Sequence, residues 1–192
     1  MTLDEIKIYL LVNSNQYFIG AENIEVDNNV LQGLIQKGLG LFGNHRPSVI
    51  YEELSINSES QRIKTTSDGR IITYIKQMFI SNPMLTDEPL EVGFAYKYIK
   101  DTNTLYTMGR GSFWCSIFTI PLLDDITIAD TEFLDIMIGL YLQYVGSVRK
   151  GFTIEGLPIA NDAEDLYSNG KELVDTTIQQ LKETDSSWFL AI

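Results

Sequence analysis

The chain has 192 residues and a formal net charge of −12. This length suffices for one domain with a substantial core. The negative charge argues against duplex nucleic acid or an anionic membrane as the main partner, because both attract a concentrated positive field. We therefore expect a single domain over residues 1–192 that recognises no specific nucleic-acid sequence and no membrane.

Three features of the sequence indicate the compartment in which the protein folds. Cys115 is the only cysteine, so no internal disulfide can form and a reducing environment fits best. Residues 1–5 lack the basic segment of a secretory signal. The long apolar run, residues 133–148, is shorter than the roughly 20 residues needed to cross a bilayer. These features predict folding in the cytoplasm.

The N-terminal part offers one ambiguous and one clear element. Residues 6–12 are apolar without a decisive period, which fits either a short strand or a helix, and residues 1–26 are a candidate N-terminal arm. Asp27 and the two residues after it are suitable N-caps for a helix that ends near residues 40–43. Its apolar positions recur at intervals of three and four: Val30, Leu31, Leu34, Ile35, Leu39 and Phe42.

Residues 48–121 carry strand signals. Asp68-Gly69 predicts a hairpin between residues 62–66 and 70–75. Residues 91–99 alternate, which places Val92, Phe94, Tyr96 and Tyr98 on one face. With further turns near residues 102 and 110, the pattern predicts an antiparallel meander of four or five strands.

The C-terminal third predicts two helices. Residues 133–148 are apolar on nearly every side, as in a helix buried all round. Gly139 and Gly146 are seven residues apart, so we expect another backbone to approach this face closely. A second amphipathic helix follows a Gly/Pro connector. The predicted fold is α+β: an antiparallel β-sheet of about residues 48–121, packed against a C-terminal two-helix hairpin (129–184) and an N-terminal helix.

Two features suggest contacts with partners. Residues 185–192 form a candidate docking tail, because leaving its large apolar side chains in water would forgo several kcal/mol of burial. The tail either folds back on its own domain or docks on another subunit. Arg110, between two glycines, would present a cation at a hairpin tip unless the turn is only structural. The candidate partner-binding residues are Arg110, Trp188, Phe189, Leu190 and Ile192.

No catalytic motif is complete. Residues 38–43 match the glycine spacing of a dinucleotide-binding loop, but a helix precedes them where that loop needs a strand. His45 is the only histidine, which nearly excludes a zinc site or a serine-histidine triad. The acidic pair at residues 124–125 lacks the spacing of a calcium loop. We expect no catalytic residues, no cofactor and no metal; an enzyme using Cys115 with His45 is the remaining catalytic hypothesis.

One block of the sequence resembles a known class of proteins. Residues 154–159, followed by Asp162, Asp165-Leu166 and residues 168–173, are similar to the C-terminal ends of virion structural proteins of tailed bacteriophages. In those proteins an apolar helix with a basic end precedes a Leu-Pro connector and an acidic helix. The resemblance covers the last third of the chain.

The resemblance implies a protein of the neck, head–tail connector or tail that forms a homo-oligomeric ring, contacts portal or tail components and resides in the virion. The resemblance assigns no catalytic residues to this chain. The alternative from another class is a small acidic cytosolic adaptor or inhibitor that binds one host protein through its acidic face.

Overall fold

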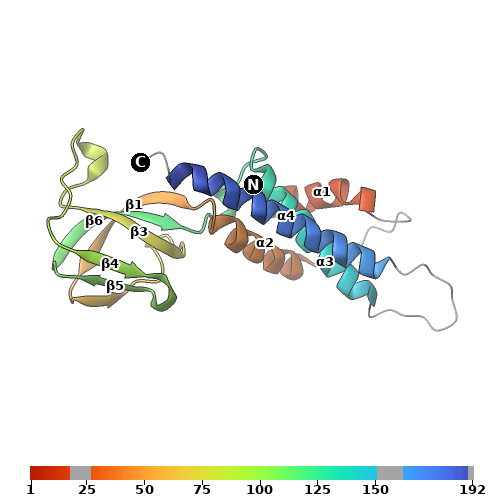
Figure 1. The fold of residues 1–192 in the computed structure, drawn as a ribbon, viewed down its shortest axis with the longest axis horizontal. Helices are drawn as coiled ribbons and strands as arrows, with labels where there is room; N and C mark the ends of the chain where they lie inside the picture. Colours follow the sequence, from red (N-terminus) through yellow and green to blue (C-terminus); the bar gives the residue numbers. More distant parts are fainter. Residues whose placement is uncertain (18–26, 151–161, 190–192) are drawn as a thin grey trace. The chain divides into compact units, whose positions relative to one another are not determined.

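The computed structural model describes residues 1–17, 27–150 and 162–189, with side chains described up to Thr184. The chain divides into two compact units (Figure 1). We call residues 1–45 and 122–192 the helical unit, and residues 46–121 the β unit. The predicted α+β class is confirmed. The packing of sheet against helices and the single domain stay predictions.

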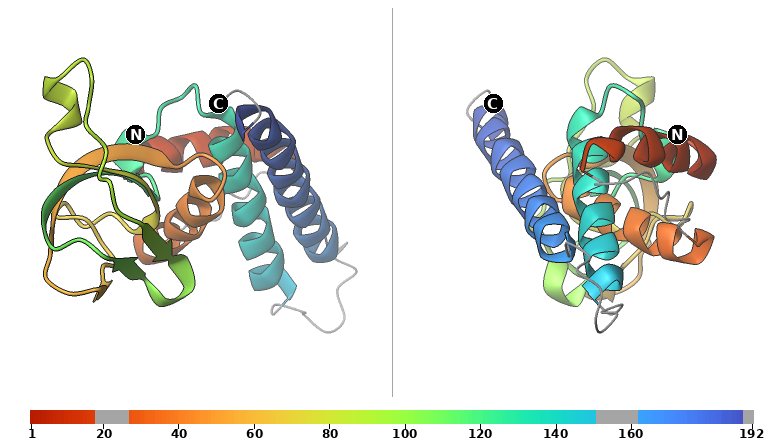
Figure 2. Two further views of the ribbon diagram at one scale, coloured as in Figure 1. Left: turned by 60° about the vertical axis from the view of Figure 1, so that its left-hand side comes forward. Right: turned by 90° about the vertical axis from the view of Figure 1, so that its right-hand side faces the viewer.

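The helical unit is built around α3 (Thr131–Lys150), which contacts α1 (Leu3–Asn13), α2 (Asn28–Gly43) and α4 (Ala163–Phe189) (Figure 2). Its short 3₁₀ turns are η1 (Asn15–Tyr17) and η4 (Leu123–Asp125). Eleven residues of α3 are buried, among them Phe133, Met137 and Tyr141. The prediction of a helix surrounded by neighbours is confirmed.

Residues 6–12, which the sequence left open between strand and helix, belong to helix α1. A capping box at the start of this helix favours it. The Thr2 hydroxyl accepts from the Glu5 amide at 3.2 Å, and the Glu5 carboxylate accepts from the Thr2 amide at 2.7 Å. This reciprocal cap satisfies two backbone donors that a helix start leaves without partners. The N-terminal ammonium donates to Leu123 O and Ile126 O, at 3.0 and 2.6 Å. Residues 1–17 therefore contribute to the helical unit.

Helix α2 has the bounds that its cap predicts. The Asp27 carboxylate accepts from the Asn29 amide at 2.6 Å. The glycine-spaced segment 38–43 is the C-terminal part of this helix, so it is no dinucleotide loop. At Gly38 a Cβ would lie 2.7 Å from Met137 Sδ, which explains a glycine inside a helix at this point.

The β unit contains six strands in two antiparallel sheets rather than one meander. Sheet A has the order β1-β6-β3 and sheet B the order β2-β5-β4. The strands are β1 (Ser48–Ile56), β2 (Ser60–Arg62), β3 (Ile72–Phe79), β4 (Tyr96–Ile99), β5 (Thr104–Thr107) and β6 (Gly111–Thr119). Two further 3₁₀ turns are η2 (Pro83–Leu85) and η3 (Lys100–Thr102). The meander was wrong because β6 pairs with β1 and β3, not with its neighbour β5.

The two sheets share one hydrophobic core. Tyr98 is buried, and Val92, Phe94 and Tyr96 pack against this core, so the predicted common face is confirmed although β4 itself is short. The core members come from all strands except β2, with Ile63 following β2 directly: Leu54, Ile56, Ile63, Ile72, Ile75, Met78, Tyr98, Leu105, Cys115 and Ile117.

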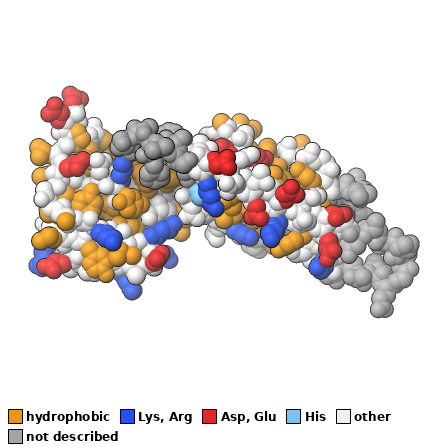
Figure 3. Space-filling model, in the orientation of Figure 1, with side chains coloured by type: hydrophobic (Ala, Val, Ile, Leu, Met, Phe, Trp, Pro, Cys, Tyr) orange, Lys and Arg blue, Asp and Glu red, His pale blue; other side chains and the backbone are white. Residues whose placement is uncertain are grey.

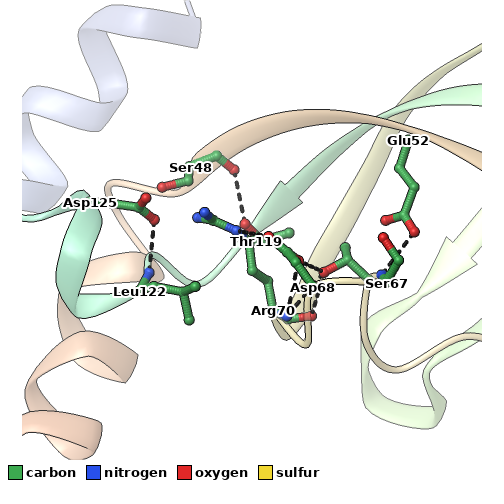
Figure 4. Close-up of polar contacts among 9 residues, drawn as sticks. Ser48, Glu52, Ser67, Asp68, Arg70, Thr119, Leu122 and Asp125 are labelled. Atoms are coloured by element: carbon green, nitrogen blue, oxygen red, sulfur yellow. Dashed lines mark hydrogen bonds and ion pairs between the residues drawn. The ribbon is translucent and has the colours of Figure 1, made fainter.

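The predicted hairpin at Asp68-Gly69 is confirmed close to the turn, where Thr65 and Ile71 form an antiparallel bridge and the Ile72 amide donates to Lys64 O at 3.0 Å. Gly69 has φ +87°, and its amide donates to Thr66 O at 3.0 Å. Asp68 accepts from Thr66 Oγ1 at 2.5 Å and from Arg70 Nε at 2.6 Å (Figure 4); these bonds lower the pKa of the Asp68 carboxyl. The flanking strands β2 and β3 lie in different sheets.

Candidate interaction surfaces

Helix α4 is fixed against α3 by three glycines. A Cβ at Gly139 would lie 2.7 Å from Gly170 O, and one at Gly146 would lie 2.6 Å from Ala163 O. Gln143 Nε2 also donates to Gly170 O at 3.2 Å. The close approach predicted from Gly139 and Gly146 is confirmed, and it holds α4 with one face buried.

The opposite face of α4 is polar and acidic. Near its start, Arg149 forms an ion pair with Asp162, and Lys150 Nζ lies 3.3 Å from Glu164 Oε1. Its exposed charged residues are Glu164, Asp165, Lys171, Glu172, Asp175, Lys182 and Glu183. Acids therefore outnumber bases on the surface that this helix presents.

The net negative charge belongs entirely to the helical unit. That unit has six Lys and Arg against eighteen Asp and Glu, whereas the β unit has eight of each. The whole-chain charge of −12 is thus the sum of one strongly acidic unit and one neutral unit. Charged patches on the β unit are therefore set by local arrangement.

Arg110 lies in an exposed turn between β5 and β6. The predicted hairpin tip was wrong, because these two strands belong to different sheets and do not pair. A Cβ on the preceding Gly109 would lie 2.1 Å from the Phe94 ring, so the turn is pressed onto that ring. The Arg110 side chain is 67% exposed and lies 3.7 Å from the carboxylate of Glu59, whose side chain is 78% exposed. Such surface pairs contribute little, so the Arg110 cation is accessible to a partner.

The other predicted contact residues lie at the C-terminus. Helix α4 runs to Phe189, so the docking tail begins with helical backbone and includes Trp188 and Phe189. The side chains of these two residues, and all of Leu190 and Ile192, lie outside the described residues. Their binding role stays a prediction.

Sequence reasoning missed an exposed apolar tip between β3 and β4. Met84 is 65% exposed and Leu85 is 81% exposed, and the acids Asp87 and Glu88 follow them. We call residues 80–90 the tip loop; it projects from the β unit (Figure 1). A usable signal was present: a Met-Leu pair between two prolines, where no strand or helix would bury it.

The tip loop is held by backbone bonds at its base and its end. The Ile80 amide donates to Leu90 O at 2.9 Å, and the Val92 amide donates to Met78 O at 3.0 Å. At the end, Asn82 Oδ1 accepts from the Met84 amide at 3.0 Å and caps η2. The apolar side chains are thus presented on an ordered support.

The outer face of sheet B combines an aromatic ring with cations. Lys97 lies directly across from Tyr106, and Arg62 lies across from Thr104, two residues from Tyr106 on the same face. Tyr106 is 45% exposed and Met108, just beyond β5, is 79% exposed. Figure 3 shows Lys and Arg side chains around an apolar patch over β4 and β5. We call Arg62, Lys97, Tyr106 and Met108 the cationic face.

Cys115 is one of the two residues on which the remaining catalytic hypothesis rests. Cys115 is buried in the core, and burial together with the Glu52 charge raises the pKa of its thiol to about 12. A thiol in that state is not a nucleophile at neutral pH. Burial and the raised pKa argue against the Cys115–His45 hypothesis.

Glu52 itself faces inward from β1, opposite Cys115. One carboxylate oxygen accepts from the Ser67 amide at 2.8 Å (Figure 4). The other is buried and has no hydrogen-bond partner among the described residues.

A hollow of about 510 Å³ lies between the end of α3 and the start of α4. Its walls include Ser147, Lys150, Glu164 and Tyr167, and two of these charges already pair with each other. Within residues 1–17, 27–150 and 162–189, no three His, Cys, Asp or Glu side chains are grouped to hold a metal ion. The described helices also include none with the length and apolar character of a membrane span.

No family model matches this chain, and no curated protein matches it either.

Proposed function

We propose that this protein is a non-enzymatic virion structural protein of a tailed phage, a neck, head–tail connector or tail component that assembles as a homo-oligomeric ring. The observation that supports the proposal is that the described residues expose large apolar and charged side chains in separate patches, which could serve as contact surfaces. These are the acidic face of α4, the Arg110 turn, the tip loop and the cationic face. The similarity of residues 154–173 to phage virion proteins supplies the class.

Charge distribution supports assembly of copies. A subunit with an acidic unit and a neutral unit carrying cations offers attraction between unlike surfaces on neighbouring copies. Contacts between unlike surfaces close into rings when the rotation between copies allows it.

Light scattering and electron microscopy of purified protein test the proposal. We expect a discrete species several times the monomer mass, ring-shaped in projection, that associates with portal or tail components. A strictly monomeric protein without affinity for those components would contradict it.

A second candidate is a small acidic adaptor or inhibitor that binds one host protein. The concentration of acidic charge on the helical unit favours it, since acidic surfaces can occupy cationic sites of a partner. A pull-down from host lysate that recovers one host protein in equal amount, with no self-association, would support this candidate over the ring.

A further inference from the structure

We propose that the tip loop of one copy docks on the cationic face of the next copy. This inference rests on the proposed ring and names one of its interfaces. The tip offers Met84 and Leu85 with the carboxylates of Asp87 and Glu88. The face offers Tyr106 and Met108 with Lys97 and Arg62.

The two surfaces match in chemistry. The tip loop contains two acids and no Lys or Arg. Among the described residues, Lys97 and Arg62 form no ion pair that would have to be broken first. An apolar contact rimmed by opposite charges combines burial with attraction that selects the correct partner.

The two surfaces cannot meet within one copy. Figures 1 and 2 place the tip loop and strands β4 and β5 at opposite ends of the β unit. When the tip loop of one copy binds the cationic face of the next, the contact is head-to-tail. Head-to-tail contacts generate rings when the rotation between copies closes. A self-complementary dimer contact would require the same patch on both copies.

The tip is preorganised for docking. Asn82 caps η2, Pro83 begins it, and the Ile80–Leu90 hydrogen bond closes the base of the loop. A segment held in one conformation loses less entropy on binding than a disordered one. The exposed Met84 and Leu85 side chains are therefore presented from a loop whose backbone is held by hydrogen bonds.

Two variants test the docking. The tip variant carries Asp87→Lys and Glu88→Lys, and the face variant carries Arg62→Glu and Lys97→Glu. All four positions are exposed, so we expect both variants to keep the wild-type circular dichroism. Each alone should lose self-association by at least about tenfold, measured by sedimentation velocity. The control Glu53→Lys with Asp124→Lys reverses two exposed acids outside both surfaces and should associate like the wild type.

Mixing the variants gives the decisive result. The tip variant keeps an intact face and the face variant keeps an intact tip, and the reversed tip also matches the reversed face in charge. The mixture should therefore regain association into oligomers of alternating copies, which neither variant forms alone. One chain carrying all four substitutions should regain self-association, because the charges are exchanged.

Four outcomes would overturn the inference. A wild-type ring that both variants still form would refute this interface and leave the proposed function standing. A wild-type monomer would refute both. Loss of association in the face variant alone would assign the face to another acidic segment, such as α4. Binding of a labelled single-stranded oligonucleotide that Lys97→Glu abolishes, with self-association intact, would assign the face to nucleic acid.

Discussion

Among single residues, Cys115 decides whether thiol chemistry is available. Its thiol is buried and its pKa is raised to about 12. We predict that a thiol-specific disulfide reagent leaves the native protein unlabelled at mildly alkaline pH and labels one thiol after denaturation in guanidinium. Rapid labelling of the native protein, with its circular dichroism unchanged, would show that the thiol is reactive and would reopen the catalytic hypothesis.

Asp135 provides a test of burial in α3. Burial, and then the neighbouring Glu132 charge, raises the pKa of the Asp135 carboxyl. A raised pKa in the folded state means that ionisation opposes folding, so the penalty appears as the pH rises above the unfolded value of about 3.9. Asp135→Asn should therefore increase the free energy of unfolding at pH 7.

The same comparison at acidic pH serves as the control. Below about pH 3.9 the carboxyl is neutral in both states, so urea unfolding should give nearly equal stabilities for the two proteins. A variant that is less stable at neutral pH would mean that the Asp135 charge makes a favourable contact.

At the scale of elements, the contact between α3 and α4 depends on the absence of side chains. Gly139→Ala would place a methyl group 2.7 Å from Gly170 O and 2.6 Å from Val174 Cγ2. We expect it to reduce the free energy of unfolding by about 1–3 kcal/mol, as overpacking does. Urea unfolding followed by circular dichroism measures the change.

Gly33→Ala is the matched control. Gly33 also lies inside a helix, but a Cβ there meets no atom within 4 Å. It should stabilise the protein by about 1 kcal/mol through helix propensity alone. Equal effects of the two substitutions would mean that helix propensity, not contact, explains the glycines.

The helices and strands also show which parts of the fold can be predicted from local sequence patterns. The bounds of α2 follow from the Asp27 cap and a three-four period, and the burial of α3 follows from its continuous apolar run. Helix α1 was ambiguous because Ile8 and Val12 are exposed and blur its stripe; the Thr2–Glu5 capping box was the overlooked signal. The strand pairing could not be predicted, because β1 pairs with β6 across more than fifty residues. Turn residues indicate only which strands adjacent in the chain pair with each other.

Candidate contact residues could likewise be predicted only where their signal lies within one short stretch of sequence. Arg110 was predictable because glycines on both sides mark a turn. The cationic face was not, because Arg62, Lys97 and Tyr106 come from three separate strands and meet only through the order β2-β5-β4.

For the whole molecule, the separation of charge has a consequence for stability. The helical unit has eighteen acids and only six bases, so repulsion among its acidic side chains is strong at low ionic strength. We predict that added salt raises the midpoint of thermal unfolding followed by helical circular dichroism, because salt screens this repulsion. A midpoint that falls with salt would mean that attractive pairs, such as Arg149–Asp162, dominate the unit.

We propose that this protein acts through its surfaces and by joining copies of itself. The most direct measurement of this proposal is sedimentation velocity of the wild-type chain over a wide concentration range at low and high salt. We predict one discrete oligomer, in exchange with monomer and weakened by salt. A single species at the 21.8 kDa monomer mass under every condition would contradict it.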